Sequence, residues 1–105
     1  MRYAAASDAN QVEIVAALRA AGATVQDLHE VGAGCPDLLV GYRGINFLLE
    51  VKASARAILT AFEQGWFLEW RGQAAIVRDA ESALCAIGAI EPPCYDPAHV
   101  QEEER

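Results

Sequence analysis

Residues 32–52 of the chain read GAGCPDLLVGYRGINFLLEVK, and the other segments can be understood around them. Closely spaced glycines open this segment, and two short apolar runs follow at 38–42 and 45–51. Two such runs joined by a short glycine-containing turn predict a β-hairpin, here with Arg43-Gly44 at the turn. Both runs are apolar on both faces in their middles, which predicts a central, buried position in a sheet.

Three ionisable residues, Asp37, Glu50 and Lys52, interrupt this apolar hairpin. Burying a charge costs several kcal/mol unless it is compensated, so these residues need an explanation. Side chains alternate along a strand, so Glu50 and Lys52 project to one face, and Asp37 on the neighbouring strand can lie opposite them. Two converging carboxylates suit Mg²⁺ or Mn²⁺, and a lysine beside the metal suits phosphodiester hydrolysis. A structural ion pair of Lys52 with either carboxylate explains the same spacing equally well.

The composition limits the class of protein. With 105 residues, of which 53% are hydrophobic, the chain suits one domain with one core, which we expect at 1–90, followed by a mobile acidic tail at 91–105. No apolar run approaches the roughly 18 residues of a membrane span, and no signal peptide is apparent. Three cysteines, Cys35, Cys85 and Cys94, match no metal-ligand spacing and favour buried or incidental thiols in a reducing cytoplasm.

The formal net charge of −7 argues at first against a nucleic-acid partner. Residues 91–105 carry five acids and one arginine, so the tail holds more than half of this charge. A divalent cation shared by Glu13, Asp37 and Glu50 would bring the remaining body to about −1, once the charge of the ion is counted. The chain still has no basic stripe, which counts against tight DNA binding.

Helical and strand spacing predicts the elements outside the hairpin. Asp8-Ala9-Asn10-Gln11 has the form of a capping box, which predicts a helix with Asp8 as N-cap, running to Ala21 and ended by Gly22. Residues 24–31 alternate imperfectly and fit a strand. Gly32-Ala33-Gly34 leads into another strand rather than a helix, which excludes a nucleotide-binding glycine motif.

After the hairpin, spacing predicts a helix from residue 58 or 59 to Trp70, a strand over 73–78, and a helix over 80–89 capped by Asp79. Phe62, Trp66, Phe67 and Trp70 form an aromatic ridge, which favours core or subunit interface over base stacking. The predicted order is helix, strand, strand, strand, helix, strand, helix. This order indicates an α/β fold with a mixed central sheet flanked by helices.

Two further residues have an ordinary explanation on spacing alone. Glu13 lies in the first predicted helix beside its apolar stripe, where an acid near the N-terminus favours the helix dipole. Gln64 lies between aromatics of the later helix and is by default a polar helix residue. The pattern by itself therefore assigns neither residue to a site.

Pro36-Asp37 followed by Glu50-Val51-Lys52 is similar to the signature of the PD-(D/E)XK nucleases. The wider frame resembles the VRR-NUC branch of that superfamily, in its short single-domain phage and prophage type, over roughly residues 8–87. The residues that carry this resemblance are Asp8, Asn10, Gln11 and Glu13, then Gly34-Cys35-Pro36-Asp37-Leu38, then Leu49-Glu50-Val51-Lys52, and finally Gln64.

The resemblance implies a restriction-endonuclease-like core of order αβββαβ(α), a Mg²⁺- or Mn²⁺-dependent nuclease activity and a homodimer. It implies that Asp37, Glu50 and the Val51 carbonyl bind the metal, with Glu13 as a further ligand, directly or through water. It also implies that Lys52 is the catalytic lysine and that Gln64 braces Lys52 or the metal site. For Glu13 and Gln64, the resemblance reverses the interpretation from spacing alone.

Members of this branch that stand alone resemble Holliday-junction resolvases, so the resemblance implies a branched DNA substrate in a bacterial or phage-infected cytoplasm, with no nucleotide cofactor. We assign Arg43 and Arg56 to DNA contacts. Two departures from the family pattern, the nearly uncharged connector after Lys52 and Gly65 inside the helix, bear on DNA affinity and substrate geometry. The alternatives are a catalytically silent nuclease-fold module of a phage that binds DNA or protein, and a structural protein with an ion pair at the motif.

Overall fold

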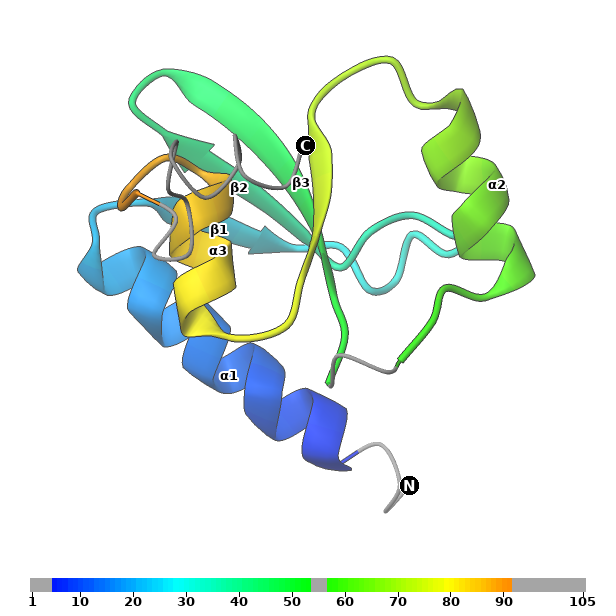
Figure 1. Ribbon diagram of the computed structural model, residues 1–105, viewed down its shortest axis with the longest axis horizontal. Helices are drawn as coiled ribbons and strands as arrows, with labels where there is room; N and C mark the ends of the chain where they lie inside the picture. Colours follow the sequence, from blue (N-terminus) through cyan, green and yellow to red (C-terminus); the bar gives the residue numbers. More distant parts are fainter. Residues whose placement is uncertain (1–4, 54–56, 92–105) are drawn as a thin grey trace, which may run out of the picture.

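The computed structural model describes residues 5–53 and 57–91, and these form a mixed α/β fold (Figure 1). The order of elements is the predicted one, and four strands form a sheet in the order β1-β2-β3-β4. β1 pairs with β2 and β2 with β3 in antiparallel fashion, whereas β4 runs parallel to β3. The elements are α1 (Ala5–Ala20), β1 (Thr24–Asp27), β2 (Leu38–Tyr42), β3 (Ile45–Val51), α2 (Ala61–Glu69), β4 (Ala74–Val77) and α3 (Ala80–Ala86).

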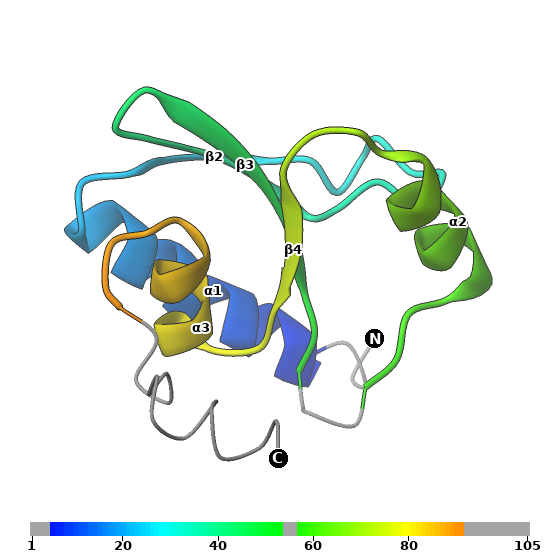
Figure 2. The ribbon, with the colours of Figure 1, turned by 45° about the horizontal axis from the view of Figure 1, so that its top comes forward.

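Helices cover the two faces of the sheet unequally. α1 and α3 lie together on one side of the sheet, and α2 lies on the other side (Figures 1 and 2). The core is on the first side, where fully buried Ile14 and Leu18 of α1 belong to one cluster with alternate residues of the strands. These strand residues are Leu38, Val40, Leu49, Val51 and Val77. Because side chains alternate along a strand, Glu50 and Lys52 project to the side of α2.

The central hairpin is confirmed in both strands and in its turn. Arg43 and Gly44 both have positive φ, at 53° and 81°, as a two-residue type I′ turn requires. The turn sets the register, which pairs Tyr42 with Ile45 and continues to the pair Leu38 and Leu49. One step further along this register, Asp37 comes opposite Glu50. The turn therefore determines which acidic residues meet.

The end of α1 is as predicted, but its start is not. Gly22 has a φ of 101°, the amide of Ala23 donates to the Leu18 carbonyl and that of Gly22 to the Arg19 carbonyl, which is a Schellman ending. The helix begins at Ala5, so Asp8 lies within the helix and is not its N-cap. The alanines before Asp8 are the strongest helix formers and extend the helix upstream of the predicted cap.

Other boundaries differ from prediction by a few residues. β1 ends at Asp27 rather than Val31, because the Asp27 carboxylate accepts the amide of His29 at 2.7 Å and turns the chain. β4 and the last helix are shorter than predicted, while Asp79 caps α3 as expected. The tail after Glu91 and the connector residue Arg56 lie outside the described residues. Within residues 5–53 and 57–91, no helix has the length and apolar character needed to cross a bilayer.

α2 is not a core helix of this chain, which corrects one interpretation of its aromatic ridge. None of its residues is buried, and the side chains of Phe62 and Leu68 are 78% and 81% exposed. Within the ridge, Trp66 stacks on Trp70 with ring centroids 4.6 Å apart. The other interpretation of the ridge, a subunit interface, stays a prediction.

A close backbone approach joins α2 to the loop that precedes β2. Gly34 has a φ of 83°, and a Cβ built on it would collide with the backbone carbonyl of Phe62 in the first turn of α2. Figure 2 shows the corresponding cyan loop beside α2. Gly32 also has a positive φ, of 75°, but a Cβ there would meet nothing.

This difference makes Gly34→Ala and Gly32→Ala a matched pair. Both variants force a left-handed backbone on an alanine, which costs roughly 1–2 kcal/mol. Only Gly34→Ala must also displace α2, so we expect its loss of unfolding free energy in urea to exceed that of Gly32→Ala by about 1 kcal/mol or more. Equal losses in the two variants would show that the contact between Gly34 and Phe62 does not hold α2.

Candidate active site at the ends of strands β2 and β3

Asp37 lies directly before β2, and its carboxylate is fixed by the neighbouring strand. Its Oδ2 atom accepts the backbone amide of Val51 at 2.8 Å. The Asp37 carbonyl in turn accepts the amide of Leu28, which ties the loop after β1 to the same place. The side chain and the backbone carbonyl of Asp37 are therefore both held by hydrogen bonds from backbone amides. These bonds fix the direction of the other carboxylate oxygen, Oδ1.

Glu50 is the one charged residue among the buried residues that the structure describes. It is only 3% exposed, and its Oε2 atom lies 3.5 Å from the Nζ atom of Lys52. The other oxygen, Oε1, is buried and has no hydrogen-bond partner within the described part of the chain. An unpartnered buried carboxylate oxygen costs free energy and indicates a position at which a ligand would be stabilised.

Lys52 is the only lysine in the sequence. Its ammonium group donates to Oε1 of Glu63 at 2.8 Å, in addition to its longer contact with Glu50. The side chain is 14% exposed and the Glu63 side chain 17%. The ammonium group of Lys52 is thus shared by the carboxylates of Glu50 and Glu63, on the face of the sheet that α2 covers.

Glu63 was missed by the sequence analysis, although a signal for it is present. Thr60 and Glu63 form a capping box at the start of α2, in which each side chain bonds the backbone amide of the other residue. The spacing of a threonine followed three residues later by a glutamate before an apolar run is the usual signature of such a box. Recognising it would have placed Glu63 in the first turn of the helix that follows Lys52.

Burial and mutual repulsion control the charges of this cluster. Desolvation raises the pKa of Glu50 to about 8, and repulsion from Asp37 and the close side-chain contact with Glu63 add to the effect, against the attraction of Lys52. Desolvation also raises the pKa of Asp37, against the hydrogen bond from Val51. Desolvation opposes the charges of Glu63 and Lys52 too, but their mutual hydrogen bond, together with the Thr60 amide at Glu63, outweighs it, so the pKa of Glu63 is lowered and that of Lys52 is raised.

Asn10 of α1 supports the site from the opposite side of the sheet. Its side-chain amide donates to the carbonyls of Lys52, at 3.3 Å, and of Arg78, at 3.0 Å. These two carbonyls follow the ends of β3 and β4, so Asn10 joins the chain just after both strands. Asn10 belongs to the predicted capping box and to the family pattern, but neither pattern assigns it a role at the site.

The structure does not bring Glu13 or Gln64 into this contact network. Glu13 is exposed on α1, one turn beyond Asn10. The Gln64 side chain is also exposed and donates to the carbonyl of Leu59 at 3.1 Å. The residue of α2 that contacts Lys52 is its neighbour, Glu63. The predicted roles of Glu13 as a metal ligand and of Gln64 as a brace therefore stay predictions.

The two arginines assigned to DNA lie away from these contacts or outside the description. Arg43 is exposed at the hairpin turn, with its guanidinium 5.0 Å from the centre of the Tyr42 ring. Arg56 lies outside the described residues. Of the cysteines, Cys35 and Cys85 are partly buried, and Cys94 is outside the described range.

The donor set at the strand ends fits a hard divalent cation. Asp37 and Glu50 offer carboxylate oxygens, and the unpartnered Oε1 of Glu50 is the observation that most favours a cation at this position. Mg²⁺ in proteins is commonly held by one or two carboxylates, with water and phosphate oxygens completing the shell. Among the residues that the structure describes, no three His, Cys, Asp or Glu side chains are gathered closely enough to hold a metal ion. The Val51 carbonyl stays a predicted ligand.

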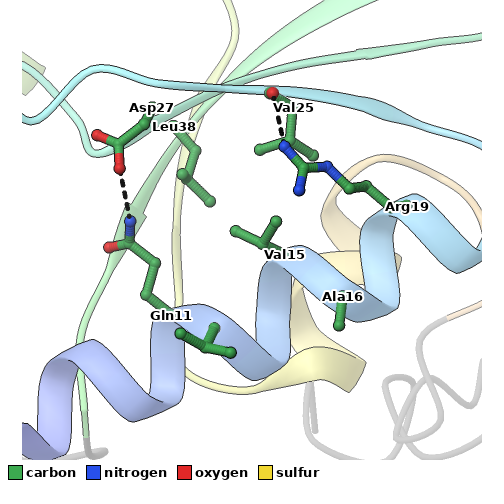
Figure 3. A pocket seen from close by; sticks show the side chains of 8 residues that line it. Gln11, Val15, Ala16, Arg19, Val25, Asp27 and Leu38 are labelled. Carbon is green, nitrogen blue, oxygen red and sulfur yellow. Dashed lines mark hydrogen bonds between the residues drawn. The ribbon is translucent and has the colours of Figure 1, made fainter.

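A separate hollow of about 540 Å³ lies between α1 and the strands β1 and β2 (Figure 3). Gln11 reaches across it to Asp27 at 3.5 Å, and Arg19 donates to the carbonyl of Val25 at 3.3 Å. Its floor is apolar, with Val15 and Leu38 among its lining residues. None of the lining residues is Asp37, Glu50 or Lys52, so this hollow is distinct from the cluster of charges.

The order αβββαβα, with a mixed four-stranded sheet between helices, is compatible with a restriction-endonuclease-like fold. Comparison with solved structures gives the more particular result: the chain has the fold of a structure described as a VRR_NUC domain, with a TM-score of 0.62. The two sequences are 24% identical, and the match covers 78% of this chain and 94% of the other. Neither protein-family models nor curated proteins give a match.

The buried carboxylate of Glu50 predicts how stability depends on pH in the absence of divalent cations. A carboxyl whose pKa is raised from 4.5 to about 8 in the folded state favours unfolding once it is ionised. The free energy of unfolding should therefore fall by a few kcal/mol as the pH rises from about 5 to 8, and Glu50→Gln should remove most of this slope in urea titrations.

His29 provides the control for this measurement. Its pKa is raised by the hydrogen bond to Asp27, so its contribution to stability is also lost as the pH rises. This residue is exposed, however, and His29→Gln should leave most of the slope in place. A slope that disappears in His29→Gln and persists in Glu50→Gln would contradict the assignment.

Proposed function

We propose that this protein is a Mg²⁺- or Mn²⁺-dependent endonuclease that hydrolyses phosphodiester bonds in DNA. The observation that carries the proposal is the geometry at the end of β3, where the buried carboxylate of Glu50 has one unpartnered oxygen, Oε1, while its Oε2 atom lies 3.5 Å from the Nζ atom of the only lysine in the sequence. Asp37, whose carboxylate accepts the Val51 amide, is the third residue of the proposed site. The fold shared with a VRR_NUC domain supports the same conclusion.

The side chains divide the work of such a reaction. Asp37 and Glu50 would hold the cation, which when bound polarises the phosphate and lowers the pKa of the attacking water. Lys52 places an ammonium group beside these carboxylates, where it stabilises the negative charge that develops on the phosphate in the transition state. The burial of Glu50 keeps bulk water from screening this charge pattern.

The substrate we propose is branched DNA, cut by a cytoplasmic homodimer. Because the net charge is −7 and the chain has no basic stripe, the DNA in this proposal is held through the local site rather than through a broad basic surface. In this proposal Arg43 and Arg56 contact the DNA backbone, and Glu13 binds the cation through water. A homodimer would place two sites on opposite strands of a junction, as its two-fold symmetry requires.

One observation favours a second candidate, a nuclease-fold module that binds DNA or protein without cutting it. The ammonium of Lys52 already donates a hydrogen bond to Glu63 at 2.8 Å. A substrate phosphate would therefore compete with the Glu63 carboxylate for this ammonium. Such a module would keep the fold and the ion pair and would show no cleavage.

Cleavage assays separate the two candidates. We expect cutting of four-way junction DNA, with flap and linear DNA as comparison substrates, in Mg²⁺ or Mn²⁺ and none in EDTA. Glu50→Ala and Lys52→Ala should each lower the rate by about 100-fold or more, because each removes a group that acts in the transition state.

Glu30→Ala is the matched control, since Glu30 is exposed in the turn after β1 and should leave the rate unchanged. No metal-dependent cleavage of any substrate by the folded protein would refute the endonuclease proposal and favour the binding module. Cleavage that persists in both site variants would indicate a contaminating nuclease.

A further inference from the structure

The side chain of Lys52 is held at the site by a partner on another element. Lysine has a long flexible stem and loses much conformational entropy when it is fixed in one position. Here its ammonium donates to Glu63 at 2.8 Å, a shorter contact than the 3.5 Å to Glu50. Glu63 rather than Glu50 therefore provides the main anchor of the lysine.

The position of Glu63 is itself set by the backbone. The same Oε1 atom that accepts Lys52 also accepts the amide of Thr60 at 2.8 Å, and the Thr60 hydroxyl accepts the amide of Glu63 at 3.2 Å. These reciprocal bonds restrict the rotamer of Glu63 to one that closes the capping box. Its carboxylate is therefore presented to Lys52 as a fixed group of the first turn of α2.

The rest of α2 contributes little to holding the helix against the sheet. None of its residues is buried, whereas its first turn carries both the contact with Gly34 and the ion pair with Lys52. Gln64 bonds the carbonyl of Leu59, and Glu69 is exposed at the other end of the helix. The polar link from α2 to the site is thus made by Glu63.

We propose that Glu63 is a positioning residue, which holds the Nζ atom of Lys52 beside Glu50 so that the ammonium faces the substrate phosphate. This inference rests on the proposed nuclease function and adds the first turn of α2 to the active site. The structure shows the contact with Lys52 for Glu63, whereas the side chain of its exposed neighbour Gln64 donates to the carbonyl of Leu59. In this proposal Glu63 is not a ligand of the cation, and it acts by holding the ammonium group of Lys52.

The test is Glu63→Gln, compared with Glu69→Gln on the same helix. Glutamine at this position keeps the capping box, so the helix start should persist while the charge that anchors Lys52 is lost. We expect kcat in Mg²⁺ to fall by about 10- to 100-fold with little change in KM, as for other residues that orient a catalytic group. Glu69→Gln removes an equal charge and should change neither constant.

A spectroscopic readout follows the lysine without any substrate. Because Lys52 is the only lysine, selective ¹⁵N labelling of lysine gives a single ammonium signal, which is visible when the ion pair slows proton exchange. This signal should be present in the wild type and in Glu69→Gln and lost in Glu63→Gln. The melting temperature of Glu63→Gln should move by no more than about 5 °C. Glu63→Ala provides a second variant that removes the same partner.

The outcomes separate this inference from the proposed function. An ammonium signal and a kcat that both match the wild type in Glu63→Gln and Glu63→Ala would overturn the positioning role. If the wild-type protein cuts no DNA, the nuclease proposal fails by itself, and loss of the signal in Glu63→Gln would still establish Glu63 as the anchor of Lys52. A signal unchanged by the substitution would then overturn the anchor as well.

Discussion

The alternation of side chains along β3 is the constraint on which both the core and the candidate site depend. Leu49 and Val51 point to the side of α1 and α3 and are buried in the core. Glu50 and Lys52, one step out of phase, point to the side of α2. A shift of one residue in the pairing of β2 with β3 would exchange the two faces, placing the charges in the apolar core and the leucine and valine on the side of α2. The register set by the turn at Arg43-Gly44 therefore protects packing and chemistry together.

The charged cluster is incompletely neutralised by the residues that the structure describes. Lys52 faces Glu50 and Glu63, while burial, together with repulsion from Asp37, raises the pKa of Glu50 to about 8. Natural proteins keep such unfavourable arrangements mainly where function needs them, since burying an unpaired charge lowers stability. A divalent cation at Asp37 and Glu50 would remove much of this repulsion, which is the physical reason for proposing one.

α2 has an unusual place in this small fold. It follows β3 and precedes β4 in the chain, yet it packs through its first turn and leaves Phe62 and Leu68 in solvent. The first turn carries the two groups that matter for the site, Glu63 beside Lys52 and the Phe62 backbone beside Gly34. The position of α2 and the position of the Lys52 side chain are therefore linked, so a displacement of α2 should also displace the ammonium of Lys52.

Local patterns in the sequence determined the order of elements and the central hairpin with its turn. They also determined the helix end at Gly22 and the cap at Asp79. Each of these features depends on residues within a few positions of one another. The same patterns identified Asp37, Glu50 and Lys52 as candidate site residues, because charged residues within an apolar hairpin can be recognised from the sequence alone. Local patterns failed at Asp8, where upstream alanines extended the helix, and at the aromatic ridge of α2, whose spacing says nothing about whether another layer covers it. Only the tertiary structure decided that Glu63 is the residue of α2 that reaches Lys52 and that Asn10 joins the chain beyond β3 and β4. Those contacts join residues 11 to 68 positions apart, and the packing of helices on the two faces of the sheet determines which side chains meet there.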